Sequence, residues 1–148
     1  MARFTVEVPA PPRSAFDYLA DPRHRPQWQS SLRAVTVLDA GPPRVGTRWL
    51  DRTAVGAAPR LRIVEMNPPT SGGAGTWAEL GEWHGLRAYL HLTFTALADD
   101  RTALGVDLRV RSSLPWVPVR LVLQALAPAA VRADLRRAAR ILARQAGE

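Results

Sequence analysis

The chain of 148 residues contains no cysteine, and all 20 of its basic side chains are arginine. Without cysteine, it cannot form disulfides, thiolate zinc sites, iron–sulfur clusters or a cysteine nucleophile. Its three histidines are far apart, and it has no metalloprotease, phosphate-loop or nucleophile-elbow motif. We therefore expect no metal and no cofactor.

Long uninterrupted apolar segments are also missing. The start, MARFTVEVPAPP, has no apolar stretch of about 7 to 15 residues behind a basic end, so we expect no signal peptide and a cytoplasmic protein. The most apolar run, Leu114 to Val131, is interrupted by three prolines, Arg120 and Gln124. These residues argue against a transmembrane segment.

The net charge of +7 suggests an anionic partner, but arginine without lysine is also what a GC-rich genome produces. Near the C-terminus, arginine recurs regularly at every fourth residue. We call this set the arginine stripe: Arg132, Arg136, Arg140 and Arg144. Such spacing predicts one face of a helix. We interpret it as a solvated face, expect no specific nucleic acid, and keep contact with a membrane surface as a minor alternative.

Alternating and helical patterns predict one order of elements along the chain. Phe4, Val6 and Val8 indicate a strand, which PAPP ends, and a short helix and a further turn follow before Trp28. Short separators favour antiparallel pairing of the later strands. These strands are expected at 33–38, 47–55, 60–66, 76–83, 86–97 and 102–111.

The last part of the chain predicts a helix. Helical spacing runs from Trp116 through Leu126 and continues from Val131 to Leu142, with Pro128 expected to kink or split it. We therefore predict an α+β fold in which a seven-stranded, curved antiparallel sheet wraps around a long C-terminal helix, with two short helices after the first strand. The length suits one domain, residues 1–148.

Three segments in this order, AFDYLADPRHRPQW, VGTRW and IVEMNPP, carry a family resemblance. The chain resembles the START-like or SRPBCC superfamily of helix-grip proteins, in its polyketide cyclase/dehydrase and lipid-transport branch. The resemblance implies that Asp21, Pro22 and Trp28 form a packing corner that supports the sheet. An alternative places Trp28 at the mouth of a cavity, with Arg23, His24 and Arg25 at the surface.

The carboxylates of the middle strands are the candidate chemistry of such a cavity. Strand alternation places Glu79 on one face with Trp77 and Trp83, where poor solvation would raise the pKa of its carboxyl group and suit it to general acid or base catalysis. A bulge would reverse this parity, so a water-facing position stays open. The full set of expected cavity residues is Trp28, Trp49, Asp51, Glu65, Trp77, Trp83, Ala88, Leu90, Leu92, Phe94, Leu108, Val122 and Leu126.

Three functions remain open at this point. The first is binding of a hydrophobic small molecule, such as a lipid, an isoprenoid or a polyketide-like aromatic compound. The second is a polyketide aromatase/cyclase or dehydratase that uses a cavity carboxylate, with Glu79 as the candidate catalytic residue. The third is an interaction protein that uses the arginine stripe. The fold hosts many activities, so the resemblance does not decide whether the chain is an enzyme. The oligomeric state is not predicted.

Overall fold

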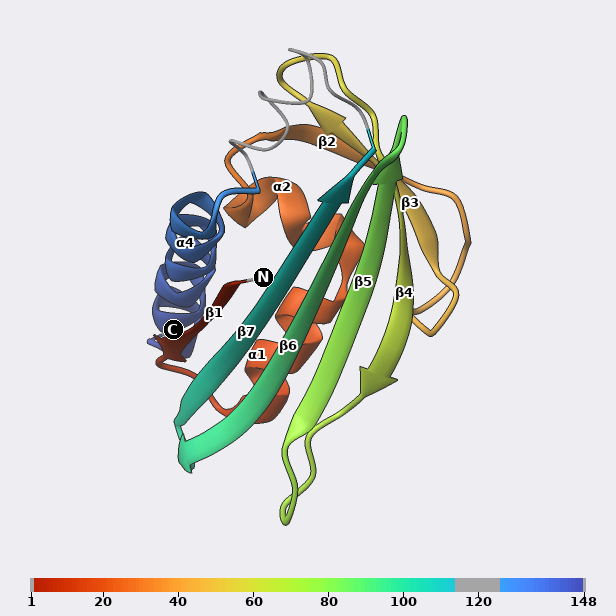
Figure 1. The fold of residues 1–148 in the computed structure, drawn as a ribbon. Helices are drawn as coiled ribbons and strands as arrows, with labels where there is room; N and C mark the ends of the chain where they lie inside the picture. Colours follow the sequence, from red (N-terminus) through yellow and green to blue (C-terminus); the bar gives the residue numbers. More distant parts are fainter. Residues whose placement is uncertain (1, 114–125, 148) are drawn as a thin grey trace.

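The computed structural model describes residues 2–113 and 126–147 and contains the predicted α+β fold (Figure 1). Seven strands form one antiparallel sheet, with short helices after the first strand and a helix near the C-terminus. The elements are β1 (Ala2–Val8), α1 (Pro12–Ala20), η1 (Pro22–His24), α2 (Arg25–Trp28), β2 (Leu32–Val37), β3 (Arg48–Thr53), β4 (Arg60–Asn67), β5 (Gly75–Trp83), β6 (Leu86–Ala98), β7 (Arg101–Ser112) and α4 (Pro128–Ala146).

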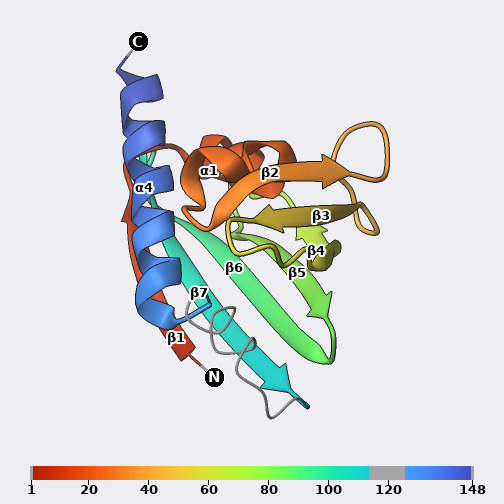
Figure 2. The ribbon, with the colours of Figure 1, turned by 90° about the horizontal axis from the view of Figure 1, so that it is seen from above.

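The sheet has the strand order β1-β7-β6-β5-β4-β3-β2. Strands consecutive in the chain are neighbours from β2 to β7, and β1 pairs with β7 to complete the sheet. The sheet curves, and the helices α1 and α2 lie against one of its faces (Figures 1 and 2). Every strand therefore presents alternate residues to this inner face and to the outer face.

The helix α4 lies along β1 and also contacts α1 and α2 (Figure 2). Its buried side includes Leu135, Ala138 and Leu142, which join the core formed by the sheet and α1. Pro128 is the first residue of α4, where its missing N–H costs nothing, so the described helix begins at this proline. The predicted helix before Pro128, including Val122, lies mainly outside the described residues.

The corner between α1 and β2 is built as the resemblance implied. Asp21 caps η1, because its Oδ1 accepts a hydrogen bond of 3.0 Å from the backbone N–H of Arg23. Pro22 and Trp28 are buried. The alternative prediction of a surface position for Arg25 is wrong: only 3% of this residue is exposed.

One irregularity changes which residues face inward. The pairing of β4 with β5 shifts between Ile63 and Glu65, so that Ile63 pairs with Glu79 and Glu65 with Ala78. A bulge of this kind adds a residue to one strand and reverses its alternation. Glu65 therefore lies on the outer face, where its carboxylate is 3.1 Å from the ring of His91 on β6. The expected cavity position of Glu65 is wrong for this reason.

None of the helices among residues 2–113 and 126–147 combines the length and apolarity needed to cross a bilayer.

Candidate functional site

A buried charged cluster joins α2 to the middle of the sheet. The guanidinium of Arg25 meets Glu79 through both of its terminal nitrogens, with Nη1 2.6 Å from Oε2 and Nη2 3.3 Å from Oε1. The same Nη2 lies 3.3 Å from Oδ2 of Asp51 on β3. All three residues are buried. A single cation from the helix corner thus holds two carboxylates from two different strands.

Two indole rings enclose this cluster. The guanidinium carbon of Arg25 lies 5.5 Å from the ring centre of Trp28 and 5.4 Å from that of Trp49. The Nε1 of Trp49 also donates a hydrogen bond of 3.0 Å to Oδ1 of Asp51. Aromatic faces attract cations and keep water away, so the charges interact in a poorly solvated place.

The cluster holds one more acidic group than basic groups. Burial raises the pKa of the carboxyl groups of Glu79 and Asp51, and the charge of Arg25 acts against this rise in both. One guanidinium neutralises one carboxylate, so the second carboxylate would be an uncompensated buried charge. The negative charge of Asp51 raises the pKa of Glu79 further, whereas the hydrogen bond from Trp49 acts against the rise for Asp51, so the extra proton belongs to the pair of carboxyl groups.

A cavity lies beside the cluster, with a volume of about 70 Å³. Arg25, Asp51 and Glu79 line it together with Gln29, the residue that follows α2. Much of its remaining wall is apolar, formed by Pro59, Leu61, Trp83, Leu86, Ala88 and Leu126, and Ser31, Thr53, Gly81 and Glu82 complete it. The site is therefore a small apolar space with charged and amide groups on one part of its wall.

The structure divides the expected cavity residues into groups. Asp51, Glu79, Trp83, Ala88 and Leu126 line the cavity. Trp28 and Trp49 flank Arg25, as described above. The other inward-facing residues belong to the packed core and do not line this cavity: Trp77, Leu90, Leu92, Phe94 and Leu108.

Sequence reasoning missed Arg25 and Gln29. The stretch DPRHRPQW has three basic or imidazole side chains close together, and nothing in its local pattern singles out Arg25. The available signal was indirect: two inward carboxylates, Asp51 and Glu79, require a buried cation. The interpretation of DPRHRPQW as a packing corner therefore agrees with the structure. The alternative does not, because Trp28 is buried and does not line the cavity, and Arg25 is buried and supplies the cation.

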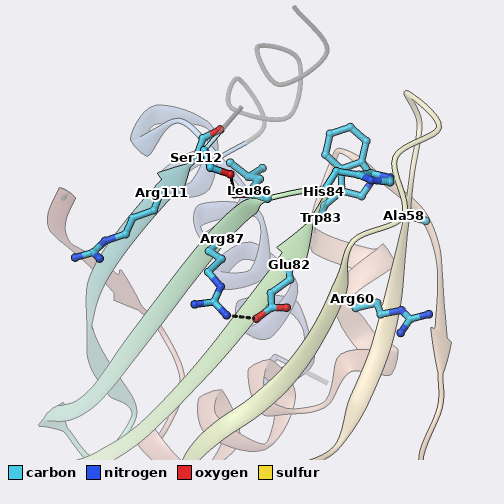
Figure 3. A pocket seen from close by; sticks show the side chains of 11 residues that line it. Ala58, Arg60, Glu82, Trp83, His84, Leu86, Arg87, Arg111 and Ser112 are labelled. Atoms are coloured by element: carbon cyan, nitrogen blue, oxygen red, sulfur yellow. Dashed lines mark hydrogen bonds and ion pairs between the residues drawn. The ribbon is translucent and has the colours of Figure 1, made fainter. Parts of the chain in front are cut away.

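An open groove of about 730 Å³ lies next to the cavity at the end of the β5–β6 hairpin (Figure 3). Glu82, Trp83 and Leu86 line both spaces. On the groove side, Arg87 donates a hydrogen bond of 3.1 Å to Glu82, and His84 lies at the hairpin turn (Figure 3). The hairpin therefore separates the inner cavity from a polar outer surface.

The predicted arginine stripe is present on α4. Arg136, Arg140 and Arg144 are exposed, whereas the guanidinium of Arg132 lies 4.8 Å from the ring centre of Phe4. No large apolar side chain is exposed between Pro128 and Ala146. Whether this face meets an anionic partner stays a prediction, and such binding would weaken with added salt.

The part of the chain that the structure describes contains no cluster of three or more histidine or acidic side chains arranged to hold a metal.

The chain was compared with models of protein families, with curated proteins and with solved structures. A family model described as polyketide cyclase / dehydrase and lipid transport matches residues 1–147. A search of curated proteins found no significant match.

Several solved structures share the fold at low sequence identity. The Zhui aromatase/cyclase from a Streptomyces species has a TM-score of 0.72 and 18% identity, over 98% of this chain and 94% of the other. A START superfamily protein from Mycobacterium smegmatis has a TM-score of 0.58 and 20% identity, over 90% and 97% of the two chains. A protein from Thermus thermophilus has a TM-score of 0.66 and 15% identity, over 97% of each chain. At these identities the likeness concerns the fold alone.

Proposed function

Because the chain belongs to the polyketide cyclase / dehydrase and lipid transport family, we propose that it binds a hydrophobic small molecule in the cavity beside Arg25. The observation that carries the proposal is the composition of this cavity. Apolar side chains form much of its wall, and the rest of the wall bears a buried guanidinium, an amide, the carboxyl groups of Asp51, Glu79 and Glu82, and two hydroxyl groups. Binding sites for small molecules combine apolar surface with a few fixed polar groups in this way.

The size of the cavity adds a requirement. Its volume of about 70 Å³ has room for about two water molecules, whereas pockets for larger ligands have about 300 to 1,000 Å³. A ligand with several rings therefore needs side chains to move. Trp83 at the end of β5 and Leu126 before α4 are only half-buried, and we propose that they move outward when the ligand binds.

A second candidate function is proton transfer to and from a bound substrate, as in cyclisation or dehydration of a polyketide-like compound. The surplus carboxyl group of the Arg25 cluster favours it. Burial raises the pKa of these carboxyl groups above the usual range, and a carboxyl group shifted in this direction is suited to give up or take a proton as a general acid or base. Glu79 was the expected catalytic residue. Its two contacts with Arg25 suit it to hold the cluster together, so we propose Asp51 as the proton carrier and Glu79 as its positioning partner.

Native mass spectrometry of freshly purified protein tests the binding proposal, together with mass spectrometry of its organic extract. We expect a stoichiometric hydrophobic adduct that is lost on denaturation and is absent from Ala88→Leu, a variant that fills the cavity. An equal adduct in Ala88→Leu would mean that the molecule binds elsewhere. If the protein is empty and no hydrophobic compound from the same cells binds on addition, the proposal is wrong.

Turnover of a bound compound tests the second candidate. Asp51→Asn should abolish proton transfer while leaving the adduct intact, because asparagine keeps the shape but cannot exchange the proton. Unchanged turnover in this variant would exclude Asp51 as the proton carrier. Glu79→Gln serves as the comparison, since it weakens the contact with Arg25 while Asp51 stays in place.

A further inference from the structure

The cavity wall contains buried polar atoms that lack partners. The Nε of Arg25 is a buried donor with no hydrogen-bond partner among the described residues, although both terminal nitrogens of the same guanidinium are engaged. The Oε1 of Gln29 is a buried acceptor that also has no hydrogen-bond partner among the described residues. Both side chains line the cavity. Both atoms have almost no accessible surface, so a ligand reaches them only when the side chains around the cavity move as proposed above. Because an unsatisfied buried polar atom is costly, each atom then favours a ligand that completes its hydrogen bonds.

The two atoms would form hydrogen bonds with different groups on a ligand. The N–H at Nε of Arg25 can donate to a carbonyl, ether or hydroxyl oxygen. The Oε1 of Gln29 can accept from a hydroxyl group. An oxygen-bearing molecule can meet the first requirement, and a hydroxy-carbonyl compound can meet both. A pure hydrocarbon leaves both atoms unsatisfied and gains only the burial of its apolar surface.

The charge of the cluster restricts the ligand further. A buried arginine usually suits an anion, but Arg25 already contacts the carboxylates of Glu79 and Asp51. An anionic ligand would bring a third acidic group to a single guanidinium in a place enclosed by Trp28 and Trp49. Like charges close together in a poorly solvated site repel strongly, and no second described cation lines this cavity.

From these observations we infer that the cavity selects neutral, oxygen-bearing hydrophobic molecules and rejects carboxylates, in spite of its arginine and the positive net charge of the protein. This inference rests on the proposed function, since it specifies the ligand of the same cavity. It gives Arg25 and Gln29 the role of specificity-determining residues.

Three probes of nearly the same shape separate the effects of a neutral oxygen atom, of apolar surface and of a negative charge on binding. Acetophenone is a neutral ketone, α-methylstyrene is its hydrocarbon analogue, and benzoate is its carboxylate analogue. Each probe is titrated into protein carrying ¹⁵N-labelled tryptophan, and the indole N–H signals are followed by NMR. Because Trp28 and Trp49 flank Arg25 and Trp83 lines the cavity, a ligand there shifts their signals.

We expect acetophenone to bind about tenfold or more tightly than α-methylstyrene, and benzoate to bind most weakly. If α-methylstyrene binds as well as acetophenone, or benzoate binds better than either, the inference is overturned while the proposed function stands. If none of the three probes shifts the indole signals at millimolar concentration, the proposed function fails together with the inference.

Two variants assign the selectivity to its residues. Arg25→Lys keeps the positive charge but removes the Nε donor, so the preference for acetophenone over α-methylstyrene should shrink severalfold. If that variant does not fold, Gln29→Leu tests the second group, with 2-hydroxyacetophenone as the probe that loses affinity. Gln27→Leu is the matched control, because Gln27 is exposed and accepts a hydrogen bond from Tyr18 outside the cavity. Equal selectivity in the wild type and in the folded cavity variants would overturn the assignment.

Discussion

The Nη1 of Arg25 lies 2.6 Å from the Oε2 of Glu79, although the two residues are 54 positions apart in the chain. The contact joins the short helix α2 to the central strand β5. Only 4% of the Arg25 side chain and 8% of the Glu79 side chain are exposed. A pair this deeply buried determines where the helix corner sits on the sheet, and it also provides the polar part of the cavity wall.

Removing the positive charge of Arg25 should therefore destabilise the folded protein strongly. In Arg25→Met, the carboxyl groups of Glu79 and Asp51 remain buried without a cation, and we expect a loss of about 3–5 kcal/mol in the free energy of unfolding. Urea denaturation of the wild type and the variant measures this loss. The control is Arg13→Met, which removes an exposed ion pair with Asp17 and should cost less than about 1 kcal/mol. Similar losses in both variants would contradict a special role of the buried cluster.

Replacing the whole cluster should restore stability but not selectivity. The triple variant Arg25→Met, Asp51→Leu, Glu79→Met removes all three charges together, and apolar replacement of a buried ion cluster is often neutral or stabilising. We expect its free energy of unfolding to exceed that of Arg25→Met by about 3 kcal/mol. A triple variant as unstable as the single variant would mean that shape, and not charge, makes Arg25 important.

The pH dependence of stability follows from the surplus carboxyl group. Burial raises the pKa of Asp51 and Glu79 in the folded protein, so the folded state holds a proton more tightly than the unfolded state. The stabilising effect of this proton is complete below the unfolded pKa and is lost as the pH rises through the folded pKa.

Asp51→Asn removes the surplus acid and should flatten this dependence. We expect the variant to gain about 1 kcal/mol or more over the wild type near neutral pH, and little or nothing at about pH 4. Melting temperatures across this range measure the difference. Asp17→Asn, at an exposed helix position, is the control. A wild type and an Asp51→Asn variant with parallel pH profiles would show that Asp51 carries no surplus charge.

Filling the cavity should separate binding from stability. Ala88 lies on β6, lines the cavity and pairs with Gly81 on β5. Ala88→Leu adds three carbon atoms to a space of about 70 Å³ and should change the free energy of unfolding by less than about 1.5 kcal/mol. Ligand affinity should fall at least about tenfold, measured by the tryptophan signals described above. Ala103→Leu, on β7 away from the cavity, is a control for added bulk.

The hairpin between the cavity and the outer groove has a turn with unusual backbone requirements. His84 and Gly85 form the two-residue connection and have φ values of 44° and 85°. Such a turn favours asparagine and glycine, whereas histidine is strained there. We expect His84→Asn to raise the melting temperature slightly and Gly85→Val to lower stability by about 1 kcal/mol or more. A destabilised His84→Asn variant would indicate that the histidine ring makes a needed contact, such as its edge contact with Trp83.

The fold could be predicted because its signals are local. Alternation in β6 and β7 and the turn residues between strands give the strand bounds to within about two residues, the usual margin at element ends. The orientation of the middle strands could not be predicted with the same certainty. The bulge between Ile63 and Glu65 is invisible in the apolar pattern, and it separates Glu65 from the cavity.

The site was only partly predictable, because its central contact is not local. Asp51 and Glu79 follow from strand parity, but Arg25 is one of several basic residues in a turn-rich stretch. Its burial depends on the way α2 meets the sheet, which no local spacing determines. The small size of the cavity also escaped prediction, since Trp77 and Phe94 fill interior space that the sequence left open for a ligand.

A contact at the other end of α2 should hold the C-terminal helix in place. Asp134 on α4 is buried, and its Oδ1 accepts hydrogen bonds from the backbone N–H of Ser30 at 3.2 Å and from its hydroxyl at 2.8 Å. Asp134→Ala removes the single oxygen that accepts both hydrogen bonds, and the donors of the exposed Ser30 lose this protein partner. We expect a loss of about 1–3 kcal/mol in the free energy of unfolding.

Two variants show whether hydrogen bonding or charge is responsible. Asp134→Asn keeps an acceptor oxygen, and burial raises the pKa of the native carboxyl group, so losing the charge should cost little. Ser30→Ala removes only the hydroxyl donor and should lie between the wild type and Asp134→Ala. A double-mutant cycle with Asp134→Ala and Ser30→Ala should give a coupling of at least about 0.5 kcal/mol. If the two losses simply add, Asp134 stabilises α4 through some other contact.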